Sequence, residues 1–312
     1  ARWNGRAVIV DGSARESKYA ALAASNAALT SATVPLRLGT NLKSTTETFA
    51  AITLEVDTRR WAGVPVLDIA PAVGTPTLGV LFLHGGGYVM GGFGSHRKLA
   101  ATIGEAAGAR VWLPEYRLAP EHPHPAALTD ALAVYAELLE QGQPADRLVI
   151  AGDSAGGGLS LTLAGAIRDA GLPMPAALVL ISPWTDLSLS GPSIASHARR
   201  DPMVSPAWLR ACSEAYRAGT AKTDTACSPL FANLAGLPPV LIQVGSEEIL
   251  LSDALRLRDR LRLTGGDCEL RQFAGLWHVF QLHYGWLDAA DEAVEQIGQF
   301  IKNKTARLAQ AA

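Results

Sequence analysis

The segment VIAGDSAGGGLS, residues 149–160, places Ser154 between an apolar run and a group of glycines. The residues before Ser154 have the pattern of a strand and those after it the pattern of a helix, so Gly152 and Gly156 flank a strand-to-helix bend. Such a bend exposes the serine hydroxyl and directs the free N–H groups of the helix N-terminus at the reaction centre. We therefore predict that Ser154 is a nucleophile. A glycine-rich turn without chemistry is the alternative.

A second glycine cluster, LFLHGGGYVMGG at residues 81–92, follows another apolar run. Consecutive glycines expose backbone N–H groups, and acyl transfer needs such donors because negative charge develops on the carbonyl oxygen. Gly85 and Gly86, joined by the N–H of Ala155, are the candidate oxyanion hole. A phosphate-binding loop is disfavoured because the G-x-x-x-x-G-K-[ST] pattern is absent from this segment.

A serine nucleophile needs a base, and His278 in FAGLWHVF is the first candidate. It follows the last expected strand, where the chain order Ser, acid, His would place it. His283 is the second candidate, and we expect His84 to order the glycine loop through hydrogen bonds. His122 and His124 stand among prolines in EHPHP, which indicates a rigid turn rather than a metal site.

The acid that orients the base should follow the apolar run PVLIQVG, in the segment SEEILLSD. Its task would be to hold the imidazole in the correct tautomer and to stabilise the imidazolium. Glu247, Glu248 and Asp253 all qualify by position, and the residues alone leave this choice open.

The elements that must position these residues alternate between short apolar strands and longer helical patterns. The first two expected strands are close enough to form a hairpin, and the later alternation predicts a mostly parallel sheet with helices on both faces. Eight strands are expected at 50–57, 64–70, 78–84, 110–116, 147–152, 176–182, 239–245 and 268–274. Helices are expected at 95–107, 126–141, 155–170, 250–264 and 285–303.

Two regions, 1–48 and 187–230, interrupt this alternation. Within the second, Ser205 is a candidate N-cap before Pro206, which predicts a helix over 205–218. We interpret the two regions as a helical cap over the carboxyl ends of the strands, where open α/β sheets place their ligand sites. Surface decoration without a role is the alternative. No linker divides the chain, so residues 1–312 are expected to form a single domain.

Composition narrows the function further. The net charge is −2 with no clustered Lys or Arg, which disfavours a nucleic-acid partner. Three widely separated cysteines fit free thiols in a reducing compartment. The apolar runs are too short for a membrane span, and AVIV near the N-terminus is too short for the core of a signal peptide. We therefore expect a soluble cytoplasmic protein without a membrane span.

Three motifs together, HGGGYVMGG, PEYRLAPEHPHPAAL and GDSAGGGLS, resemble the bacterial hormone-sensitive-lipase-like esterases of the α/β-hydrolase superfamily. The resemblance runs from about residue 75 to the C-terminus. It implies an α/β-hydrolase fold and a cap built from the N-terminal segment and the insertion. The family's nucleophile, base and oxyanion donors fall on Ser154, His278, and on Gly85, Gly86 and Ala155.

The acid departs from the family pattern. Many members carry D-P-L-R-D-E-G after P-P-x-L-I, and laying that pattern on PPVLIQVGSEEILLSDA without gaps places its first Asp on Glu248, 30 residues before His278. We rank Glu248 first, Glu247 second and Asp253 third. Asp153, beside the nucleophile, is expected to brace the loops.

The resemblance implies hydrolysis of carboxylic esters with short to medium acyl chains, with no cofactor and no metal. Tyr88 and Trp184 are candidate pocket residues, with core packing as an equal alternative. A lactone, carbamate or amide hydrolase using the same triad is the first rival, and a non-catalytic small-molecule receptor on the same fold is a remote one. Dimers are common in the family, so a homodimer is possible here.

Overall fold

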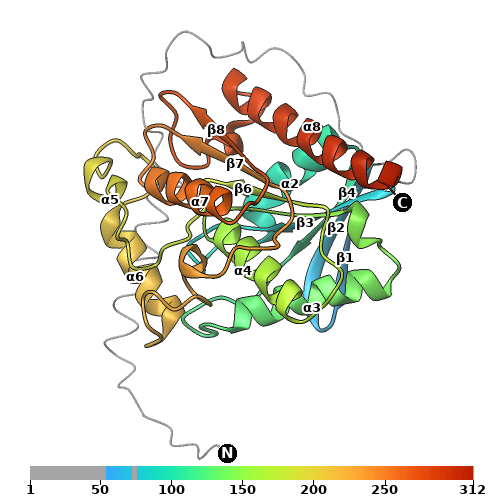
Figure 1. The fold of residues 1–312 in the computed structure, drawn as a ribbon, viewed down its shortest axis with the longest axis horizontal. Coiled ribbons are helices and arrows are strands. Elements are labelled where there is room, and N and C mark those ends of the chain that lie inside the picture. The colour runs from blue at the N-terminus through green and yellow to red at the C-terminus, as the bar shows by residue number, and fades with distance from the viewer. Residues whose placement is uncertain (1–53, 72–75, 312) are drawn as a thin grey trace, which may run out of the picture. The chain divides into compact units, whose positions relative to one another are not determined.

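An eight-stranded sheet forms the centre of the protein in a computed structural model, which describes residues 54–71 and 76–311 (Figure 1). The spatial order of the strands is β1-β2-β4-β3-β5-β6-β7-β8. In chain order the strands are β1 Leu54–Trp61, β2 Val64–Pro71, β3 Leu78–Leu83, β4 Ala109–Pro114, β5 Leu148–Asp153, β6 Ala177–Ile181, β7 Val240–Gly245 and β8 Cys268–Phe273. All eight expected strands are present. The first, expected at 50–57, is described over Leu54–Trp61, and residues 50–53 lie outside the described part; the others differ little at their ends.

The sheet is mixed at one side and parallel elsewhere. Strands β1 and β2 pair antiparallel as the expected hairpin, and β2 pairs antiparallel with β4. Every pair from β4 onward in the spatial order is parallel, from β3 beside β4 to β7 beside β8. The mostly parallel sheet predicted from the alternating pattern is therefore confirmed.

Helices cover both faces of this sheet, and each face has its own hydrophobic core. Successive strand residues point to opposite faces, so Val80 and Phe82 pack with α2 and α8, whereas Leu81 and Leu83 pack with α3, α4 and α7. These helices are α2 Phe93–Ala107, α3 Ala126–Glu140, α4 Ala155–Asp169, α7 Leu251–Leu263 and α8 Asp288–Ala311. Figure 1 shows the two helical layers on either side of the strands.

The insertion at 187–230 holds two short helices, α5 (Ser193–Ser196) and α6 (Pro206–Arg217). Ser205 caps α6 as expected, because its hydroxyl accepts the Trp208 N–H at 3.2 Å and Pro206 occupies the first helical position. The other expected part of the cap, residues 1–48, lies outside the described residues. The cap and the single domain therefore remain predictions.

The carboxyl ends of the parallel strands bring distant parts of the sequence to one edge of the sheet. The glycine loop follows β3, Ser154 follows β5, the segment from Ser182 follows β6, and the candidate acids follow β7. His278 follows β8. Helices after β3 and β4 cover opposite faces of the sheet. In open α/β sheets such a change of side is where ligands bind.

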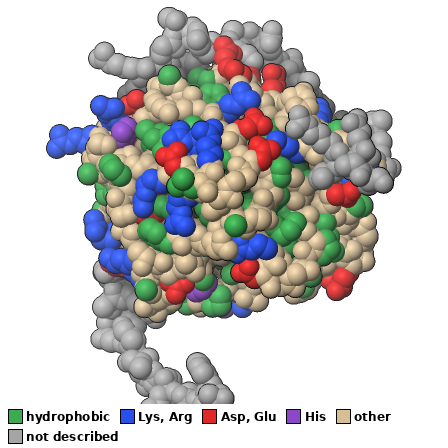
Figure 2. Space-filling view, in the orientation of Figure 1, with side chains coloured by type: hydrophobic (Ala, Val, Ile, Leu, Met, Phe, Trp, Pro, Cys, Tyr) green, Lys and Arg blue, Asp and Glu red, His purple; other side chains and the backbone are tan. Residues whose placement is uncertain are grey.

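The exposed surface carries both signs of charge. Figure 2 shows basic and acidic side chains intermixed on the viewed face. Two arginines of α7 are paired with acids: Arg256 with the buried Asp186 at 2.7 Å and Arg258 with Asp259 at 2.7 Å. In the described part of the chain, no helix has the length and apolar character required to cross a membrane. The three cysteines are free thiols, as expected, and all three are buried.

Candidate active site

Ser154 stands on a backbone turn that few residues other than glycine adopt. Its φ is 52° and its ψ is −119°, a strained conformation between the end of β5 and the start of α4. The turn is held by three backbone hydrogen bonds: the Ser154 N–H donates to Ile181, and its carbonyl accepts from Gly158 and Trp184. The side chain makes no capping bond to the helix it precedes. The hydroxyl is therefore left free for other chemistry.

The glycines on either side of Ser154 are required by close backbone approach. A Cβ on Gly156 would lie 1.9 Å from the Leu83 carbonyl oxygen, and one on Gly152 would lie 2.4 Å from the Gly156 carbonyl oxygen. Any side chain would force α4 away from β3 and β5. The G-x-S-x-G pattern thus reflects helix-to-strand contact around the serine.

His278 and Glu248 form a buried pair on the loops that follow β8 and β7. Nδ1 of His278 lies 2.9 Å from Oε2 of Glu248. Glu248 is 0% exposed, and its Oε1 accepts hydrogen bonds from the Gly245 N–H and the Ser182 hydroxyl. A carboxylate only accepts hydrogen bonds, so Nδ1 of His278 carries the hydrogen and Nε2 has the free electron pair of a base.

The described residues include no hydrogen bond between the Ser154 hydroxyl and His278. The end of β6 links the two loops: the Ser154 N–H donates to the Ile181 carbonyl, and the N–H of Val279, next to His278, donates to the Ser182 hydroxyl. Nucleophile-to-base bonds are often long before substrate binds and tighten in the reacting complex. The geometry leaves Ser154 and His278 at the same sheet edge.

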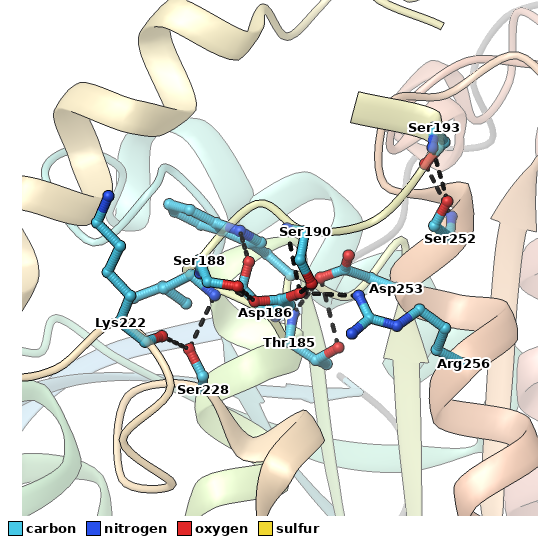
Figure 3. Close-up of polar contacts among 12 residues, drawn as sticks. Thr185, Asp186, Ser188, Ser190, Ser193, Lys222, Ser228, Ser252, Asp253 and Arg256 are labelled. Atoms are coloured by element: carbon cyan, nitrogen blue, oxygen red, sulfur yellow. Dashed lines mark hydrogen bonds and ion pairs between the residues drawn. The ribbon is translucent and has the colours of Figure 1, made fainter. Parts of the chain in front are cut away.

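The other two candidate acids contact different partners. Glu247 is partly exposed and pairs with Arg200 at 3.4 Å. Asp253 is fully buried, and its Oδ2 accepts the N–H groups of Thr185 and Asp186 at 2.8 and 2.9 Å (Figure 3). Neither contacts His278, so Glu248 is the acid that the fold brings to the base.

Asp253 belongs to a polar network beneath the insertion. Its neighbour Asp186 pairs with Arg256 at 2.7 Å and accepts from Ser188 and Ser190 (Figure 3). Burial raises the pKa of Asp253 to about 7, against the opposing effect of the two backbone N–H groups. This carboxyl therefore holds the backbone of Thr185 and Asp186, just before the insertion.

The glycine loop requires a correction to the predicted oxyanion hole. The N–H of Gly85 donates to Oδ1 of Asp153 at 3.0 Å, so this donor is already used within the protein. Among the described hydrogen bonds, the N–H groups of Gly86, Gly87 and Ala155 have no protein acceptor. The free donors are thus one residue further along the loop than expected, and the sequence reasoning missed Gly87.

Asp153 and two histidines fix that loop from below. Oδ2 of Asp153 lies 3.3 Å from Nε2 of His96, while its Oδ1 holds Gly85. Burial alone would raise the pKa of Asp153, but His96 and His84 lower it overall. His84 stacks on Tyr116 at 4.2 Å, and its Nδ1 lies 2.8 Å from the Gly85 carbonyl oxygen. Asp153 and His84 therefore both order the glycine loop, as their positions in the sequence led us to expect.

Tyr88 and Trp184 are buried packing residues, which is the second of the two alternatives that the sequence left open. They are 1% and 0% exposed, so neither faces a space that would admit a water molecule. Tyr88 stacks on Tyr216 of α6 with ring centroids 3.7 Å apart, and the Trp184 indole donates to the Asp186 carbonyl. Their position beside the motifs reflects the attachment of the insertion to the glycine loop.

Helix α6 lies against the glycine loop. A Cβ on Gly87 would lie 2.7 Å from the ring of Trp208 and 2.8 Å from Sγ of Cys212, both on α6. Trp208 is only partly buried, in contrast to Tyr88. The sequence did not predict a position for Trp208 beside the glycine loop, because an aromatic residue on an amphipathic helix usually packs in the core.

The remaining histidines lie away from the Glu248 carboxylate. His283 Nδ1 lies 3.3 Å from the Phe280 carbonyl oxygen, and His124 lies near the Tyr216 hydroxyl at 3.4 Å. Across residues 54–71 and 76–311, no three His, Cys, Asp or Glu side chains are grouped in a way that could hold a metal ion.

The contact with Glu248 changes the pKa of His278. Burial alone lowers the pKa of His278, but the hydrogen bond and charge of Glu248, with Asp201 and Asp153 further away, outweigh it. The net result is a pKa above the ordinary 6.5.

This shift has a measurable consequence. Only the neutral imidazole can accept a proton, so we expect kcat/KM to fall as pH decreases through the raised pKa of His278. A pH profile of kcat/KM for a neutral ester should show an acid limb with its midpoint above 6.5. A midpoint below 6.5 would contradict the role of Glu248 in raising the pKa.

An α/β sheet with a serine on a strained turn after β5 and a buried His–Glu pair after β8 and β7 defines an α/β hydrolase. A profile of the α/β-hydrolase fold matches residues 80–282. An acetyl-hydrolase of Streptomyces hygroscopicus is 44% identical over 226 residues, which is 72% of this chain and 76% of that protein.

Solved structures agree. An esterase of the bacterial hormone-sensitive lipase family is 37% identical with a TM-score of 0.80, covering 83% of this chain and 87% of that one. The structure of EstE5 soaked with p-nitrophenyl butyrate is 38% identical with a TM-score of 0.80, and the match covers 84% of this chain and 88% of that one. The chain belongs to the bacterial hormone-sensitive-lipase-like esterases and is a carboxylic ester hydrolase.

Proposed function

We propose that this protein hydrolyses short- to medium-chain carboxylic esters through an acyl-enzyme on Ser154. The observation that carries the proposal is the buried His278–Glu248 pair at the same sheet edge as the strained Ser154 turn. An oriented base at the same sheet edge as a serine hydroxyl that makes no capping bond is the arrangement that nucleophilic acyl transfer needs.

In the first step the Ser154 oxygen attacks the ester carbonyl carbon while Nε2 of His278 takes the hydroxyl proton. Charge develops on the carbonyl oxygen, and the free N–H groups of Gly86, Gly87 and Ala155 stabilise it. Collapse of the tetrahedral intermediate breaks the ester C–O bond, and His278 gives its proton to the departing alcohol. Glu248 keeps the imidazole oriented and stabilises its positive form throughout.

In the second step a water molecule attacks the acyl carbon. His278 takes a proton from the water, and the second tetrahedral intermediate then breaks the bond to Ser154. The proton passes from His278 to the serine oxygen, so the free carboxylic acid and the original enzyme are released. The chain supplies every group for both steps.

The acyl-chain range is supported by the relatives' names. The Streptomyces relative is named an acetyl-hydrolase, and EstE5 was soaked with a butyryl ester. The insertion also lies close to the glycine loop, since Trp208 and Cys212 of α6 lie against Gly87. A long acyl chain would have to pass this helix.

A substrate panel tests the proposal. We expect p-nitrophenyl acetate and butyrate to be cleaved fastest, with rates falling for long-chain esters, and lactones and anilides to be poorer. Activity confined to lactones or to anilides would overturn the ester assignment, and fastest cleavage of long chains would overturn the chain length. Cytoplasmic location and a homodimer stay predictions, which fractionation and light scattering would test.

A further inference from the structure

Ser182, at the end of β6, is placed in an unusual way for a serine. It is 0% exposed and its φ is 47°, in the left-handed region where glycine is favoured. Its N–H donates to the Gln243 carbonyl of β7 at 2.7 Å. The backbone here costs less with glycine, so the presence of a side chain points to a use for the hydroxyl.

The hydroxyl of Ser182 connects the acid and the base. It donates its single hydrogen to Oε1 of Glu248 at 2.9 Å and accepts the Val279 N–H at 3.1 Å. Val279 directly follows His278 in the chain. One oxygen atom therefore fixes both the direction of the Glu248 carboxylate and the backbone that carries the imidazole.

The same strand end also carries the nucleophile. The residue before Ser182, Ile181, accepts the N–H of Ser154 at 2.8 Å. Ile181 and Ser182 thus contact two members of the triad, Ser154 and Glu248, and the backbone of Val279 next to the third. Among the described contacts, the side chains of Ser154 and His278 make no hydrogen bond to each other.

We infer that Ser182 is a positioning residue that holds the Glu248–His278 pair in register with Ser154. With its hydroxyl in place, Oε1 of Glu248 has two donors, and Oε2 is aimed at Nδ1 of His278. Without it, the Gly245 N–H alone holds Oε1, and the Val279 N–H is left without an acceptor in the interior. The carboxylate then gains freedom to turn away from the imidazole.

The test compares Ser182→Ala with Ser182→Gly. We expect kcat to fall about 10- to 100-fold in both variants with KM nearly unchanged, because a buried group that loses its partner costs a free energy of this order. Ser182→Gly loses the same hydrogen bonds but relieves the left-handed backbone, so it should be more stable than Ser182→Ala and remains informative if the alanine variant is unstable. Wild-type kcat in Ser182→Gly would show that only the backbone conformation matters and would overturn the inference.

A pH profile separates positioning from general destabilisation. The groups facing His278 are Glu248, Asp201 and Asp153, and Glu248 is the strongest in raising the pKa. If Ser182 orients Glu248, its loss weakens that pair and moves the acid limb of kcat/KM toward 6.5. An unmoved limb would overturn the inference. An upward shift would also overturn the inference. It would mean that the hydroxyl only weakens the electrostatic effect of Glu248 on His278 and does not orient the carboxylate.

Ser228 provides a matched control. It is also 0% exposed, accepts a backbone N–H from Leu187 at 2.9 Å and donates to the Lys222 carbonyl at 2.7 Å. Ser228→Ala should lower the melting temperature without moving the acid limb. The inference rests on the proposed serine mechanism, so Ser154→Ala is assayed beside it. Activity in Ser154→Ala would refute the mechanism, whereas an inactive Ser154→Ala with unaffected Ser182 variants would refute only the positioning role.

Discussion

Replacing Ser154 with alanine is expected to lower kcat/KM for p-nitrophenyl butyrate about 10⁴- to 10⁶-fold. The hydroxyl is the only atom lost, and it makes no capping bond to α4, so the helix keeps its backbone contacts. Alanine must still adopt a φ of 52°, as serine does. The melting temperature should therefore remain close to that of wild type while the reaction stops.

Covalent labelling provides an independent measurement. An organophosphonate should add one adduct to wild type, at the peptide that contains Ser154, and none to Ser154→Ala. A receptor that had lost catalysis would not give this result, because adduct formation needs the activated oxygen. Residual hydrolysis in Ser154→Ala above about one part in 10³ of wild type would assign the nucleophile elsewhere.

The sheet and the Ser154 turn could be predicted because their signals are local. Apolar runs mark buried parallel strands, and Gly152 and Gly156 mark a backbone approach too close for any side chain. These signals do not depend on distant residues. The family resemblance added the order of the triad, which placed His278 after the last strand.

The parts of the site that the sequence left open or missed depend on contacts between distant segments. Gly85 looked like a free donor, but Asp153, 68 residues later, occupies its N–H. Tyr88 and Trp184 stand next to the motifs, yet tertiary packing buries both completely. Ser182 carried no sequence signal because its two partners come from loops 66 and 97 residues away. Side-chain direction in a loop is settled by such contacts.

The choice of the triad acid shows most clearly that contacts between distant segments cannot be predicted from the sequence alone. Glu247, Glu248 and Asp253 all follow β7 within one short segment, and their spacing alone does not show which faces the base. The family pattern favoured Glu248, and the fold turns its carboxylate to His278 while Glu247 faces Arg200. Glu248 and Asp253 are the two buried acids of this segment. Replacing each carboxyl with an amide of the same size tests which of them serves the base.

Glu248→Gln is expected to lower kcat about 10⁴-fold through the tautomer of His278. Two donors, Gly245 N–H and the Ser182 hydroxyl, point at Oε1 and would hold the amide oxygen there. The amide nitrogen then faces Nδ1, which must accept instead of donate. The hydrogen of the imidazole moves to Nε2, and the base can no longer take the proton of Ser154.

Asp253→Asn, the matched control, should keep kcat within a few-fold of wild type. Its oxygen can remain at Oδ2, where the Thr185 and Asp186 N–H groups hold it, and the fully buried carboxyl there has a pKa of about 7. Because that pKa lies above the ordinary 3.8, wild type loses stability as pH rises toward 7, and the asparagine variant is spared this loss. The melting temperature of Asp253→Asn relative to wild type should thus increase between pH 5 and pH 8. Equal losses of kcat in Glu248→Gln and Asp253→Asn would contradict the assignment of Glu248, because only Glu248 is in contact with the imidazole.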